Sequence, residues 1–132
     1  MHIPYFINVD VELISEEDLH PLEDELKEKI SILLSERRGG KYALNFECAS
    51  YKEGGVSGIL EQLTSVLSGL SESCSQLLAN CESRRLDVGY NSGAEGWVYG
   101  KISSELLSKV SELGFDLYIS VYGLNAAASG KK

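Results

Sequence analysis

The feature that most constrains the fold is a strict alternation of apolar and polar side chains near the start of the chain. Between residues 3 and 13 every odd position is apolar, and positions 8, 10 and 12 are Asn, Asp and Glu. A period of two is typical of a β-strand with one buried and one solvated face. A strand between two helical layers would be apolar throughout, so we predict a sheet covered by helices on one face only.

The last predicted strand alternates in the same way. Its odd positions are all apolar and are expected in the core: Phe115, Leu117, Ile119 and Val121. Its even positions include Tyr118, Ser120 and Tyr122, which we expect on the uncovered face. That face is the surface left available to a partner or to a second copy of the chain.

Helical spacing of apolar residues marks the segments between the strands. Leu22, Leu26, Ile30 and Leu33 predict a helix that runs to Arg37-Arg38 and ends at Gly39-Gly40. Three more helices are predicted, at 59–70, at 73–81 and at 103–113. The last two begin at serines placed as N-caps, Ser73 and Ser103.

The remaining strands are predicted at 42–48, at 86–90 and, as a short return from a loop, at 97–99. The order is therefore β-α-β-α-α-β-(β)-α-β. This order indicates an α+β fold with a mixed or antiparallel sheet of four to five strands and helices packed on one face. We place a single α+β domain over residues 1–125 and expect a flexible tail at 126–132.

Charge narrows the classes of ligand. The chain has 12 basic and 20 acidic residues, which gives a formal net charge of −8. This charge repels phosphate backbones and anionic lipids, so nucleic acid and membrane are not expected as ligands, whereas a basic protein partner is favoured. The N-terminus does not have the pattern of a signal peptide and no apolar run approaches the roughly 20 residues of a membrane span, so we expect a cytoplasmic protein.

Motifs for catalysis and cofactor binding were sought without success. The sequence has no G-x-G-x-x-G loop, no phosphate-binding GxxxxGK[ST] loop and no His/Cys cluster with metal-ligand spacing. Its two histidines, His2 and His20, do not belong to a triad pattern. We therefore predict a protein that is not an enzyme and uses no cofactor or metal.

Two regions are candidate partner-binding surfaces. The first is an acidic stretch at the start of the second predicted element, represented by Glu16, Glu17 and Asp18; a solvated helix start is the alternative interpretation. The second is the segment 87–99, where aromatic and acidic residues are mixed as in binding hot spots: Asp87, Tyr90, Glu95, Trp97 and Tyr99. Packing of Tyr90 and Trp97 into the core is the alternative there.

Three stretches carry a resemblance to a known family. They are 84–93, which contains Leu86-Asp87-Val88-Gly89-Tyr90-Asn91-Ser92-Gly93, then Ile102-Ser103-Ser104-Glu105-Leu106-Leu107, and 113–122. Together they resemble a small bacterial family of domains of unknown function (family 4279 type). Some similar proteins are immunity proteins of contact-dependent or polymorphic toxins. The resemblance implies a protein that neutralises a cognate toxin, most simply a basic nuclease, by covering its active surface.

Two alternatives remain open from the residues themselves. The first is a structural or self-associating module that forms a homodimer through the uncovered sheet face. The second is a small-molecule-binding or enzymatic domain with the 90–97 loop at the rim of its pocket.

Overall fold

Five strands form one mixed sheet in the order β2-β3-β1-β4-β5. The computed structural model describes residues 5–50, 54–93 and 100–123. The strands are β1 (Tyr5–Ser15), β2 (Ile30–Arg38), β3 (Lys41–Cys48), β4 (Ser83–Gly93) and β5 (Asp116–Gly123). Strand β1 lies at the centre and pairs antiparallel with β3 and β4; β2 pairs antiparallel with β3, and β5 pairs parallel with β4.

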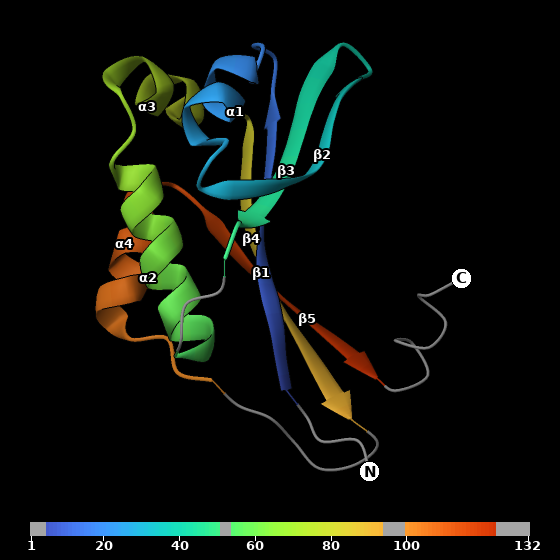
Figure 1. The fold of residues 1–132 in the computed structure, drawn as a ribbon, viewed down its shortest axis with the longest axis vertical. Helices are drawn as coiled ribbons and strands as arrows, with labels where there is room; N and C mark the ends of the chain where they lie inside the picture. The colour runs from blue at the N-terminus through green and yellow to red at the C-terminus, as the bar shows by residue number, and fades with distance from the viewer. Residues whose placement is uncertain (1–4, 51–53, 94–99, 124–132) are drawn as a thin grey trace.

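Four helices lie on one side of this sheet (Figure 1). They are α1 (His20–Leu26), α2 (Gly55–Ser68), α3 (Glu72–Ala79) and α4 (Ser104–Glu112). Helix α2 packs on β1 and β3, with α4 beside it, and α1 packs against α3. Between the layers lie fully buried side chains from both, among them Val11, Leu13, Phe46, Leu60 and Leu63. The predicted α+β class, with helices on one face of a mixed sheet, is confirmed.

The predicted helix through Arg38 is wrong beyond Leu26, where α1 ends. Residues 30–38 form β2, which makes a hairpin with β3. The two residues between the paired Arg38 and Lys41 are Gly39 and Gly40, with φ of 60° and 81°. Positive φ at both central residues is what the favoured two-residue hairpin turn requires, so these glycines reverse a strand and do not cap a helix.

The last strand also differs in part from its prediction. Phe115 is buried, but Ile119 and Val121, expected in the core, are 62% and 61% exposed. In Figure 1 the C-terminal half of β5 runs away from the helices, so the helical layer does not cover these two side chains.

Two further predictions, the short strand at 97–99 and the tail at 126–132, lie outside the described residues. None of the helices in the described ranges has the length and apolarity of a membrane span.

Candidate partner-binding site

The site is on the sheet face opposite the helices, and the alternation of β1 creates it. Val9, Val11 and Leu13 are fully buried against the helices. Asp10 and Glu12, between them, are only partly buried and project from the other face. The central strand therefore carries carboxylates into the middle of the uncovered face.

A shallow hollow of about 280 Å³ lies on this face, and we call it the acidic hollow. Its lining comes from all five strands: Ile7, Asn8, Asp10, Leu33, Glu47, Asp87, Gly89 and Tyr122. Gly89 has no side chain to fill it; an added Cβ there would stand 3.8 Å from both Ile7 and the Tyr122 ring. Three of the lining residues are carboxylates and none is a cation.

The carboxylates of the acidic hollow oppose one another. Asp10 and Asp87 are direct Cα partners on β1 and β4, a placement in which like charges destabilise a sheet. Burial is the main cause that raises the pKa of Asp10 from 3.8 to about 6, and the charges of Glu47 and Asp87 come next. The sheet thus holds a carboxyl group whose pKa lies well above its ordinary value and whose ionisation is costly to the fold.

Neighbouring polar side chains fix these carboxylates in place. The amide of Asn8, which is only 8% exposed, donates hydrogen bonds to Asp10 Oδ1 at 3.3 Å and to the Glu47 carboxylate. The Ser120 hydroxyl donates to Asp87 Oδ1 at 2.7 Å. Such hydrogen bonds orient the acids before any ligand arrives, which lowers the entropy that binding must overcome.

Arg85, which precedes Asp87 by two residues on the same face of β4, is engaged elsewhere. Arg85 Nε lies 3.6 Å from Glu12 Oε1, and its guanidinium stacks 3.8 Å from the centroid of the Tyr118 ring. Among the described residues, no group of three His, Cys, Asp or Glu side chains is arranged to hold a metal ion.

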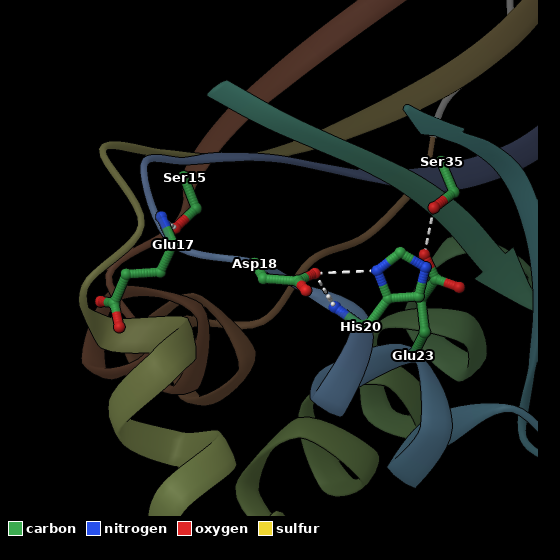
Figure 2. Close-up of polar contacts among 6 residues, drawn as sticks. All are labelled: Ser15, Glu17, Asp18, His20, Glu23 and Ser35. Atoms are coloured by element: carbon green, nitrogen blue, oxygen red, sulfur yellow. Dashed lines mark hydrogen bonds and ion pairs between the residues drawn. The ribbon is translucent and has the colours of Figure 1, made fainter. Parts of the chain in front are cut away.

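The predicted residues Glu16, Glu17 and Asp18 lie elsewhere, at the junction of β1 and α1 (Figure 2). Asp18 Oδ1 accepts a hydrogen bond from the backbone N of His20 at 2.9 Å and lies 2.8 Å from its ring Nδ1. Figure 2 shows the Glu17 carboxylate pointing away from this pair; it accepts from Asn80 at 3.1 Å. These acids do not converge on one cavity with Asp87.

Two of the residues predicted over 87–99, Asp87 and Tyr90, are described by the structure, and it separates them. Asp87 lines the acidic hollow, whereas Tyr90 is only 9% exposed and packs edge-on against Phe6 in the core. Burial also raises the pKa of the Tyr90 hydroxyl. This buried position corresponds to the alternative interpretation of the sequence, in which Tyr90 packs into the core. The other three predicted residues, Glu95, Trp97 and Tyr99, lie outside the described residues.

Sequence reasoning overlooked Asn8, Asp10 and Glu47 as site residues, although a signal for each was present. Asn8 and Asp10 occupy the polar positions of the first strand. Glu47 lies between Phe46 and Cys48, so the same alternation places it on the uncovered face. What the sequence did not contain is the pairing of β1 between β3 and β4, which brings these acids together.

Comparisons with protein-family models, with curated proteins and with solved structures find no match to this chain. The resemblance to the bacterial family of domains of unknown function therefore stays a prediction.

Proposed function

We propose that this chain is an immunity-type protein that binds a basic toxin domain in the cytoplasm through the uncovered face of its sheet. In this proposal the acidic hollow receives a Lys or Arg side chain of the toxin. The observation that carries the proposal is the set of opposed, pre-oriented carboxylates at Asp10, Glu47 and Asp87. Groups with perturbed pKa values cluster at functional sites, because their arrangement is unfavourable without a ligand.

The electrostatics favour a cationic ligand. In the free protein burial makes Asp10 costly to ionise, and the charges of Glu47 and Asp87 add to this cost. A positive charge placed among the three carboxylates offsets that cost by attraction, and charge-assisted hydrogen bonds to the carboxylates add to the gain. Binding therefore relieves a repulsion that folding leaves in place.

The rim of the acidic hollow supplies apolar contact area. Ile7, Leu33 and Tyr122 line it and are 38%, 50% and 44% exposed. Apolar and aromatic side chains around a few desolvated charges are the usual composition of a binding hot spot. A protein surface satisfies both parts of this site, whereas a small inorganic cation satisfies only the charge.

A nuclease is the toxin class that this surface fits best. Nucleases bind phosphates with basic clefts, and carboxylates on an inhibitor can occupy the positions of those phosphates. The net charge of −8 steers the two proteins together. In this proposal the chain blocks the cleft and performs no catalysis of its own.

The test uses the purified product of the adjacent reading frame, if that product is toxic, and measures binding by calorimetry together with protection of cells. The double variant Asp10→Asn/Asp87→Asn removes two charges from the acidic hollow without changing side-chain size. We expect it to weaken binding at least about tenfold, because both charges face the partner's cation.

The matched control is Glu16→Gln/Glu17→Gln, which removes the same two charges at the β1–α1 junction. It is expected to change the affinity less than about threefold, through long-range attraction alone. A larger loss in this control than in the Asp10/Asp87 variant would place the contact at the junction and refute a role for the acidic hollow. Absence of any complex, and of protection, would refute the immunity function.

A further inference from the structure

The two edges of the sheet are protected very differently. Strand β2 forms one edge and ends in the charged run Glu36-Arg37-Arg38, and its pairing with β3 is interrupted by a register shift between Ile32 and Leu34. Charges and bulges are the devices by which sheets prevent further strands from adding to an edge. Strand β5 forms the other edge of the sheet.

Strand β5 lacks these devices over most of its length. From Leu117 to Gly123 it contains no charged residue and no proline, and its register with β4 is continuous from Asp116 to Tyr122. Ile119 and Val121 are 62% and 61% exposed on the helix side, and Tyr118 is 43% exposed on the other face. An uncharged, β-branched, exposed edge of this kind is a template for strand addition.

We propose that β5 pairs antiparallel with β5 of a second copy of this chain, so that two five-stranded sheets become one continuous sheet. A twofold axis perpendicular to the sheet near Ile119 or Ser120 generates this pairing. With the axis at Ser120, Ile119 of each copy lies opposite Val121 of the other; with the axis at Ile119, the two Ile119 side chains meet. In both registers, exposed β-branched side chains are covered by each other.

Charge placement makes a second copy a suitable occupant despite the net charge of −8. The single charge of β5 is Asp116, at its first residue. In an antiparallel pair centred on Ser120 the two Asp116 residues are eight positions apart, or about 26 Å at roughly 3.3 Å per residue. This separation exceeds the Debye length of about 8 Å at physiological salt, so their repulsion is screened.

The pairing leaves the acidic hollow open, because strand addition uses the edge of the sheet and not its face. The inference therefore does not depend on the proposed toxin binding. It also differs from a homodimer through the uncovered face, which would cover Asp10 and Asp87.

The test is analytical ultracentrifugation of the full chain over a range of concentrations, with single lysine substitutions. We expect the wild type to dimerise reversibly and Ile119→Lys and Val121→Lys each to weaken the dimer at least about tenfold, since each places a charge in an apolar strand contact. The matched control is Leu107→Lys, at an apolar residue that is 44% exposed and belongs to helix α4 and not to an edge strand. It should leave dimerisation unchanged.

Amide hydrogen exchange of the wild type provides a readout that needs no substitution. Amides of β5 should exchange more slowly as the protein concentration rises, while those of β2, at the other edge, should not change. A wild type that is monomeric at every concentration, or a dimer that both lysine substitutions at the edge leave intact, would overturn the proposal.

Discussion

Two groups of carboxylates in this protein, one at the β1–α1 junction and one in the acidic hollow, differ in how their surroundings affect ionisation. At the β1–α1 junction two of the three acids have polar partners of their own: Asp18 contacts His20, and Glu17 accepts from Asn80. Hydrogen bonds from His20, first from its backbone and then from its ring, lower the pKa of Asp18. In the acidic hollow, burial and neighbouring acids raise the pKa of Asp10 to about 6.

The comparison shows that acidic sequence composition does not identify a binding surface. The junction acids look conspicuous in the sequence because they are consecutive. In the fold Asp18 accepts from the backbone of His20, the first residue of α1, and Glu17 accepts from Asn80. The acids of the hollow are scattered over three strands and look ordinary until the sheet assembles. Only the second group has an unfavourable arrangement that a ligand can relieve.

The largest expected effect on stability comes from Asp10→Asn, which keeps the size of the side chain and removes its charge. The pKa rise to about 6 corresponds to about 3 kcal/mol if taken in full, and solvent screening at this partly buried site reduces it to about 1 kcal/mol. We therefore expect the variant to unfold at higher urea concentration than the wild type at pH 7.5.

The pH dependence of this gain has a definite sign. The folded-state pKa of Asp10 lies above its ordinary value of 3.8, so its ionisation destabilises the folded state. That cost is complete above about pH 6 and disappears as the pH falls towards 3.8. The advantage of Asp10→Asn should shrink over the same window, and a gain that stays constant from pH 7.5 to pH 4 would show that the ionisation of Asp10 is not its cause.

A smaller and opposite effect is expected from Asp18→Asn. The pKa of Asp18 is lowered in the folded state, so its charge stabilises the fold above its ordinary pKa of 3.8, and this contribution is lost as the pH falls through the lowered value. Because the side chain is exposed, we expect a fall in Tm of at most a few degrees at pH 7.5. Stabilisation by this substitution would remove the contrast between the two groups.

The fold class was predictable because the alternation of apolar and polar side chains in β1 is typical of a sheet that is covered on one face only. Ile30 and Leu33 continue the spacing of Leu22 and Leu26, so the sequence predicts a helix over 30–38. The short apolar run there fits a strand equally well, and Gly39-Gly40 is a hairpin signal that was interpreted as a helix stop. Pairing with β3 decides the outcome, and the local sequence does not contain it.

For the candidate site, the sequence predicts the uncovered face of the sheet but not which residues meet on it. Alternation placed polar residues on the uncovered side of β1, but the meeting of Asp10 with Asp87 depends on strand order and register. The exposure of Ile119 and Val121 depends likewise on how far the helices extend over β5. Both features are tertiary, so a single sequence could not reveal them.

The central claim, that the acidic hollow accepts a cation from a protein partner, is tested most directly by the pKa of Asp10 itself. Carboxyl carbon chemical shifts in NMR spectra measured against pH give this value in the free protein and in the complex. We predict a pKa of about 6 when free and a pKa below 3.8 when the partner is bound, because a positive charge then favours ionisation. An Asp10 pKa that is unchanged or raised in the complex would contradict the account.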